Sequence, residues 1–148
     1  MATYREPELK KHLTAGAFHP VYFLFGREHY LIQTYLEKLI KAALGSGGNE
    51  FNLTRLDGGT ATMQMISDAI GALPMLSPKK VVVMEDLDLN KISAGESAKL
   101  KELLSDLPQT AVLIFVTRAL EVTSKGKDKF SSFIKQIDKV GAVCEFER

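Results

Sequence analysis

A glycine at the junction between an apolar run and an amphipathic segment could grip a phosphate. Residues 21–25 (Val-Tyr-Phe-Leu-Phe) are apolar and end at Gly26. In α/β proteins such a strand-to-helix turn binds phosphate through free backbone N–H groups and the helix dipole. A nucleotide-binding loop also needs the spacing G-x-x-x-x-G-K-[ST], in which the lysine meets the phosphates and the hydroxyl holds Mg²⁺. Counted from Gly26, those three positions hold Leu31, Ile32 and Gln33, so we expect a degenerate phosphate loop that binds no nucleotide.

Two carboxylates after another apolar run could hold Mg²⁺ and polarise water. Glu85 and Asp86 stand where nucleotide hydrolases keep their metal-binding acids, and Asp88 follows two residues later. They have no phosphate to act on, because Ile32 replaces the lysine. Acids are also common at strand ends, since the next helix favours negative charge near its N-terminus. We therefore favour a structural role for them, and equally for Thr117, which ends a strand where a γ-phosphate sensor could sit.

Histidine and cysteine offer little further chemistry. His12, His19 and His29 are scattered and lack cysteines at metal-ligand spacing, so we expect no metal site. The single cysteine, Cys144, cannot form an intrachain disulfide and fits a reducing compartment. It lies in the apolar run at residues 142–146, which is typical of a small core residue rather than a nucleophile. The sequence predicts no catalytic residue and no cofactor.

One lysine-rich segment could contact an acidic partner or a phosphate backbone. Lys125, Lys127 and Lys129 surround Gly126 and are opposed only by Asp128. The whole chain, however, carries 19 basic and 18 acidic residues, so it lacks the strongly basic character of a stand-alone nucleic-acid binder. A solvated loop is the simpler interpretation, and we expect any DNA contact to be local or to arise within a larger assembly.

The segment at residues 72–79 (Ala-Leu-Pro-Met-Leu-Ser-Pro-Lys) is the strongest candidate for a binding site. Pro74 and Pro78 bracket Met75 and Leu76, so the connector is stiffened before a partner arrives and loses less entropy on binding. The two apolar residues follow the break at Pro74, where helical periodicity has ended. Two interpretations remain open at this point: a turn that covers the core, and an exposed hydrophobic anchor for a partner.

The elements that position these residues alternate along the chain. Helical periodicity is present at residues 6–14, 29–44, 62–73, 93–107 and 127–140, and strand-like runs are present at residues 21–25, 51–56, 81–84, 111–116 and 142–146. After the first helix, five strands alternate with four helices. This order predicts an α/β fold, a five-stranded parallel sheet with helices on both faces. We expect the first strand in the sheet interior, the second at its periphery, and Thr60 or Thr62 as a helix cap.

Length and composition fit one globular domain of 148 residues. The first 13 residues are rich in charge and lack a signal-peptide core, and no stretch approaches the ~20 apolar residues of a membrane span. We therefore expect a soluble cytoplasmic protein. Because the chain stops directly after its last predicted strand, we expect residues 1–148 to be one domain of a longer polypeptide.

Several stretches together resemble the δ subunit of the bacterial DNA polymerase III clamp loader. They are residues 21–32 (VYFLFGREHYLI), 51–52 (FN), 56–58 (LDG), 72–76 (ALPML) and 80–83 (KVVV), of which the first and the fourth are the most specific. The resemblance covers nearly the whole chain. It implies a P-loop NTPase-like AAA+ fold, here the N-terminal domain of a subunit whose helical lid and collar domains are missing.

The resemblance also implies a role without catalysis. Subunits of this family do not hydrolyse ATP; they bind the β sliding clamp through a hydrophobic wedge and help to open the ring for loading onto DNA during replication. Met75 and Leu76 match the wedge, and Leu73 and Pro74 would position it. Further partners would be the other clamp-loader subunits, mainly through the missing domains, with DNA met only indirectly or within the DNA polymerase III holoenzyme, a DNA-directed DNA polymerase. The alternative is a nucleotide hydrolase or kinase with a nonstandard phosphate loop.

Overall fold

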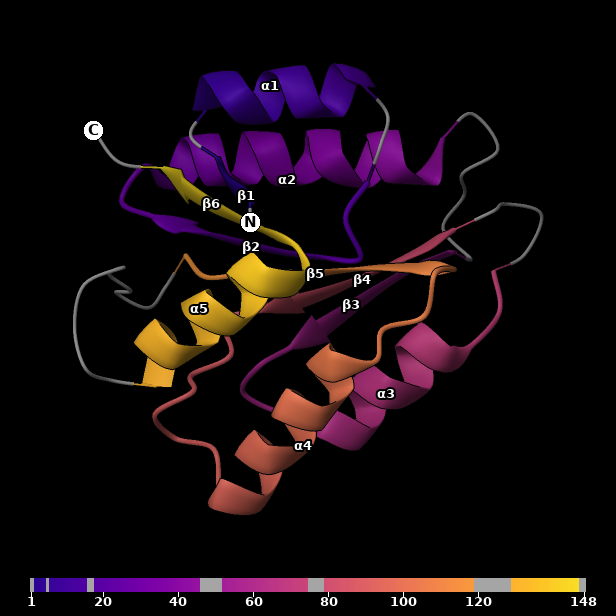
Figure 1. Ribbon diagram of the computed structural model, residues 1–148, viewed down its shortest axis with the longest axis vertical. Coiled ribbons are helices and arrows are strands. Elements are labelled where there is room, and N and C mark those ends of the chain that lie inside the picture. The colour runs from indigo at the N-terminus through magenta and orange to yellow at the C-terminus, as the bar shows by residue number, and fades with distance from the viewer. Residues whose placement is uncertain are drawn as a thin grey trace.

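The computed structural model describes residues 2–4, 6–15, 18–45, 52–74, 79–118 and 129–146, which form a sheet between two layers of helices (Figure 1). The strands are β1 (Ala2–Tyr4), β2 (Val21–Gly26), β3 (Leu53–Asp57), β4 (Lys80–Glu85), β5 (Ala111–Val116) and β6 (Ala142–Phe146). The helices are α1 (Glu6–Ala15), α2 (His29–Leu44), α3 (Met63–Gly71), α4 (Ala94–Ser105) and α5 (Lys129–Val140). The starts expected at Phe51 and Lys127 lie outside the described residues.

All strand pairs of the sheet are parallel, in the order β1-β6-β2-β5-β4-β3. The predicted α/β class is therefore confirmed, with β2 in the interior and β3 at an edge. The predicted count of five strands was one too few, because β1 pairs with β6 and places Ala2 opposite Ala142. A three-residue strand is too short to show an alternating pattern, so its pairing with β6 is not visible in the local sequence.

Each face of the sheet has its own hydrophobic core. Helices α1 and α2 cover one face, and α3, α4 and α5 cover the other (Figure 1). Side chains alternate along β2, so Tyr22 and Leu24 enter the core under α1 and α2, while Phe23 and Phe25 enter the opposite core. There Phe133 of α5 meets the ring of Phe23 edge-on, with 5.1 Å between centroids. Burial on both faces explains why the central strands are continuous apolar runs.

Side-chain caps fix where two helices begin. The Thr62 hydroxyl accepts a hydrogen bond from the Met65 N–H at 3.2 Å, which makes Thr62, rather than Thr60, the cap of α3. The Ser93 hydroxyl accepts the Glu96 N–H at 3.1 Å and caps α4 in the same way. Free N–H groups in the first helical turn are thereby satisfied.

Two helices end earlier than their periodicity predicted. Helix α3 ends at Gly71 rather than Leu73, and α4 ends at Ser105 rather than Leu107. Both leucines precede a proline, whose ring clashes with a helical conformation of the preceding residue. Leu73 therefore stands outside α3, on the connector that follows it.

Gly26 ends β2 in a conformation that other residues rarely adopt. Its φ is +135°, and an added Cβ would lie 2.2 Å from the Phe146 carbonyl oxygen. That carbonyl accepts hydrogen bonds from the N–H groups of Arg27 at 2.9 Å and Glu28 at 3.0 Å. The turn into α2 is thus built directly against the end of β6.

We expect Gly26→Ala to destabilise the fold by more than about 2 kcal/mol, because the methyl group cannot clear the Phe146 carbonyl and the φ is strained for an L-residue. Urea unfolding followed by circular dichroism measures the change. Gly71→Ala is the matched control, since a Cβ there meets nothing within 4 Å, and it should be neutral or slightly stabilising. Equal stability of the two variants would contradict the steric role of Gly26.

Two histidines that are seven residues apart in the sequence pack together beside Tyr22. The rings of His12 and His19 stack with 5.0 Å between centroids, and the Tyr22 hydroxyl hydrogen-bonds to His12 Nε2 and accepts the His19 N–H. Burial lowers the pKa of both histidines, and the charge of His19 lowers the pKa of His12 further. Their protonation is therefore less favourable in the folded chain than in the unfolded one.

This linkage sets the direction of a pH effect. Between the folded pKa values and the ordinary value of 6.5, the unfolded chain binds more protons, so stability is lost as the pH falls. We expect the melting temperature to drop as the pH is lowered below 6.5, and the His12→Gln/His19→Gln variant to drop less. An unchanged profile in the double variant would refute the linkage.

Candidate functional site

The turn between β2 and α2 has its backbone donors engaged inside the protein. A phosphate-binding loop needs N–H groups that point at the ligand. Here the N–H groups of Arg27 and Glu28 both donate to the Phe146 carbonyl, and the His29 N–H donates to the Arg27 carbonyl at 3.0 Å. Gly26 allows the close approach of β6 rather than that of a phosphate. The backbone N–H groups at the place where a nucleotide-binding fold holds its phosphate are thus hydrogen-bonded to carbonyl groups of the protein.

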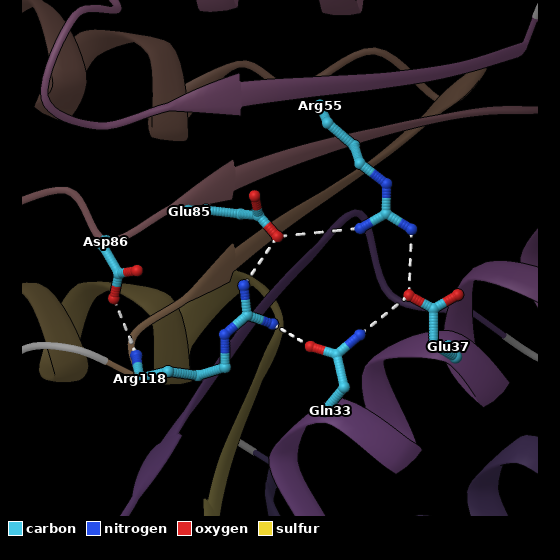
Figure 2. A network of polar contacts seen from close by, with 6 residues as sticks. All are labelled: Gln33, Glu37, Arg55, Glu85, Asp86 and Arg118. Carbon is cyan, nitrogen blue, oxygen red and sulfur yellow. Dashed lines mark hydrogen bonds and ion pairs between the residues drawn. The ribbon is translucent and has the colours of Figure 1, made fainter. Parts of the chain in front are cut away.

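The three positions that replace the phosphate-binding residues lie within α2, which begins at His29. Ile32 is fully buried in the core under α1 and α2, and its N–H donates to the Glu28 carbonyl at 3.0 Å. Leu31 packs against the same core. Gln33 is exposed and points toward the carboxyl edge of the sheet (Figure 2). A lysine at position 32 would point into an apolar core and could not reach a phosphate. This geometry supports the prediction that the turn binds no nucleotide, which stays a prediction.

Charged side chains occupy the carboxyl edge of the sheet, beside the degenerate loop (Figure 2). Arg118 follows the end of β5. Its guanidinium donates to Glu85 Oε1 at 2.8 Å and to the side-chain oxygen of Gln33. Its backbone N–H donates to Asp86 Oδ1 at 2.8 Å. Arg118 therefore joins the ends of β4 and β5 to the second turn of α2.

Arg55 of β3 closes these contacts into a ring. Its guanidinium lies 2.9 Å from Glu37 Oε1 and 3.7 Å from Glu85 Oε1. Glu37 also accepts a hydrogen bond from Gln33 Nε2 at 3.1 Å. We call the side chains of Gln33, Glu37, Arg55, Glu85 and Arg118 the carboxyl-edge ring (Figure 2). It links β3, β4 and the end of β5 to α2 by polar contacts.

The acids considered as metal ligands have structural partners. Glu85 faces two guanidinium groups, so a divalent cation placed there would be repelled by both. Asp86, whose φ is +54°, holds the backbone of Arg118. Asp88 Oδ1 accepts the Asn90 N–H at 3.0 Å and so shapes its own turn. These contacts support the structural role that the sequence analysis favours for the three acids.

Other candidate chemical groups are buried or dispersed. Thr117 is buried, and its N–H donates to the Leu24 carbonyl at 3.0 Å. Cys144 is a fully buried core residue, as expected, and burial raises the pKa of its thiol. Within the described ranges, no three His, Cys, Asp or Glu side chains are grouped as metal ligands would be. In the same ranges, no helix combines the length and the apolar character of a membrane span.

The candidate binding segment is described only in part. Leu73 is 80% exposed and Pro74 is half-buried, whereas Met75 and Leu76 lie outside the described residues. A large apolar side chain this exposed favours the anchor interpretation over the core-covering turn for Leu73. In the lysine-rich segment, Lys125 and Lys127 also lie outside the described residues, and Lys129 is the first residue of α5.

The sequence reasoning missed Arg55, Glu37 and Arg118. A general rule could have found two of them, because the carboxyl ends of parallel strands meet at one edge of a sheet. Arg55 near the end of one strand, Glu85 at the end of the next and Arg118 after a third are then expected to be neighbours. Glu37 carries no such signal, since it is one of several charged residues on the exposed face of α2.

Comparison with known proteins decides the family. The sequence matches the family model of the DNA polymerase III delta subunit over residues 22–147. The chain belongs to this family. Compared by sequence with curated proteins, it has no significant match. The match to the family model confirms the resemblance that was inferred from the sequence motifs.

Two solved structures support the same fold. The delta-family chain is similar to the Bacillus subtilis DNA clamp loader delta protein (YqeN), with a TM-score of 0.75 and 19% identity over 95% of this chain. It is also similar to a DNA polymerase III gamma subunit-related protein from Thermotoga maritima, with a TM-score of 0.57 and 13% identity over 92% of this chain. At sequence identities this low, the structural similarity shows the fold and nothing further about function. The chain spans 42% of the first protein and 45% of the second.

The carboxyl-edge ring predicts energetic coupling between strand ends. Arg118→Ala should cost about 1 kcal/mol, because the Arg118 and Glu85 side chains are only 24% and 28% exposed. Glu85→Gln should cost a similar amount, and the double variant less than the sum, with a coupling of about 0.5–1 kcal/mol by urea unfolding. Lys91→Ala, which removes a 4.0 Å pair with Asp88 at an 84% exposed side chain, should cost almost nothing. Additive costs at Arg118 and Glu85 would contradict the coupling.

Proposed function

We propose that this domain binds the β sliding clamp through residues 73–76 and helps to open the ring for loading onto DNA. Membership of the delta-subunit family supports a role as a clamp-loader component. The observation that carries the proposal is the exposed Leu73, which stands directly beyond α3 and before Pro74. Met75 and Leu76 enter the proposal through the resemblance to the family wedge.

Rigid support makes this position suitable for an anchor. Helix α3 buries Met63, Ile66 and Ile70 in the core, so its C-terminal end is held against the sheet. Pro74 fixes its own φ and restricts the residue before it, so the connector loses little entropy on binding. Burial of each large apolar side chain in a clamp pocket would contribute about 2–3 kcal/mol. Tighter binding to an open or strained ring would shift the clamp toward opening.

The proposed role needs no catalysis by this domain. The turn at Gly26 has its donors engaged, and guanidinium groups surround Glu85 where a metal would bind. The described residues therefore give no support to the alternative of a nucleotide hydrolase or kinase. ATP hydrolysis would come from other clamp-loader subunits, and polymerase activity from the holoenzyme. A cytoplasmic location, contact with DNA only within the assembly, and further lid and collar domains are parts of the same proposal.

The wedge variants test this function. We expect Leu73→Ala to weaken binding to the purified β clamp by at least about tenfold, because burial of a large apolar side chain contributes about 2–3 kcal/mol and a tenfold change corresponds to about 1.4 kcal/mol. Met75→Ala/Leu76→Ala should weaken binding further, because two such side chains are lost. Surface plasmon resonance with immobilised clamp measures the affinity. The melting temperature of Leu73→Ala should stay close to that of the wild type, since the side chain is exposed in the free domain.

Tyr30→Ala is the matched control. Tyr30 is a large side chain that is also highly exposed, but it lies in the first turn of α2. Its loss should leave clamp binding unchanged. The proposal fails if the wild-type domain does not bind the clamp, or if the wedge and Tyr30 variants bind equally well.

A further inference from the structure

The proposed binding segment at residues 73–76 is followed by a lysine whose side chain reaches a neighbouring connector. Lys79, directly before β4, donates a hydrogen bond from its ammonium Nζ to the Gln109 carbonyl oxygen at 2.7 Å. Gln109 lies in the connector between α4 and β5. The next backbone group makes the same crossing, since the Lys80 N–H donates to the Thr110 carbonyl at 2.8 Å. The chain that leaves the binding segment is thus tied to the connector that leads into β5.

Parallel pairing of the strands brings these two connectors together. Strands β4 and β5 are neighbours with Lys80 opposite Ala111, so the connectors that lead into them meet at the edge where the strands begin (Figure 1). The acceptor is itself held in place, because Pro108 fixes its own φ and the buried strand β5 begins two residues after Gln109. The Lys79 ammonium therefore bonds to a carbonyl that is held by the sheet.

The Lys79 contact is stronger than a typical surface contact of a lysine. Its donor is charged and its length is short for an N–H···O hydrogen bond, and bonds of this kind are roughly twice as strong as neutral ones. Lys79 is half-buried. Lys91 shows the contrast, because its side chain is 84% exposed and reaches Asp88 only at 4.0 Å. The Lys79 contact can therefore hold a connector in place.

We propose that Lys79 is a positioning residue for clamp binding. Its hydrogen bond to Gln109 holds the C-terminal end of the segment at residues 73–76, as the buried face of α3 holds the N-terminal end. A segment tied at both ends samples fewer conformations and loses less entropy when its apolar side chains enter a pocket. Lys79 acts through the segment and need not touch the clamp, since its ammonium is engaged within the domain. This inference rests on the proposed function.

Substitution of Lys79 in the whole 148-residue chain tests the proposal. Lys79→Met keeps an unbranched side chain but removes the donor. We expect it to bind the immobilised β clamp about threefold to tenfold more weakly than the wild type does, at low and at high salt alike. Lys79→Arg keeps a charged donor for the single carbonyl oxygen and should recover most of the affinity. Surface plasmon resonance measures both.

Two control variants lie beyond the opposite edge of the sheet, where the strands end. Arg118→Ala also removes a charge-assisted hydrogen bond, so it controls for lost stability. Lys91→Met removes a lysine from the connector that follows β4, so it controls for lost positive charge. Both should bind the clamp like the wild type, because neither residue contacts the connectors beside residues 73–76.

The outcomes separate this inference from the function on which it rests. If the wild type binds the clamp and Lys79→Met binds it equally well, the positioning role is wrong while the proposed function stands. A loss that disappears at high salt would also overturn the role, because it would show that Lys79 pairs directly with an acidic group of the clamp. Equal losses in Lys79→Met and Arg118→Ala would overturn it in favour of lost stability. A wild-type chain that does not bind the clamp would reject the proposed function and this inference together.

Discussion

The Phe146 carbonyl is the group on which the character of this domain depends. It accepts the N–H groups of Arg27 and Glu28, and it lies so close to Gly26 that no side chain fits between them. In a phosphate-binding turn, those donors would be left for the ligand. Here the end of β6 takes them, so the helix can begin almost at once and Ile32 can enter the core. These backbone contacts support the prediction of a degenerate phosphate loop as much as the missing lysine does.

Closure of the turn leaves the carboxyl edge of the sheet to protein side chains. In a nucleotide-dependent relative of this fold, Mg²⁺ and phosphates provide the charges that draw strand ends and helix together. In the delta-family domain the carboxyl-edge ring provides them, with Glu85 between two guanidinium groups. These charges are covalently part of the chain and cannot be released by hydrolysis. The contacts between α2 and the strand ends accordingly need no nucleotide.

The features that the sequence predicts correctly are those that depend on residues close together in the chain. The five long strands, the cap at Thr62 and the interior place of β2 follow from periodicity, hydroxyl chemistry and two-sided burial. The predicted ends of α3 and α4 lie two residues too far along the chain, because apolar periodicity continues to Leu73 and Leu107 although the proline after each disfavours a helical conformation there. Strand β1, the stacked pair of His12 and His19, and the carboxyl-edge ring escaped prediction for another reason. Each is created by tertiary proximity between residues that carry no signal alone.

If the domain works without a nucleotide, as we propose, it acts on a partner only through binding energy. Its apolar contacts must then be held in place before the encounter, because ordering a mobile segment would consume part of that energy. The buried face of α3 and the restriction imposed by Pro74 supply such order next to Leu73. Two or three apolar anchors provide several kilocalories per mole, at about 2–3 kcal/mol each. Only the part of this energy that is gained in the open ring and not in the closed one shifts the equilibrium, and reversal of a strongly biased two-state equilibrium needs roughly 5.5 kcal/mol of such differential affinity. The proposed wedge can therefore open the ring passively only where its pocket on the partner is formed in the open state and largely absent in the closed one.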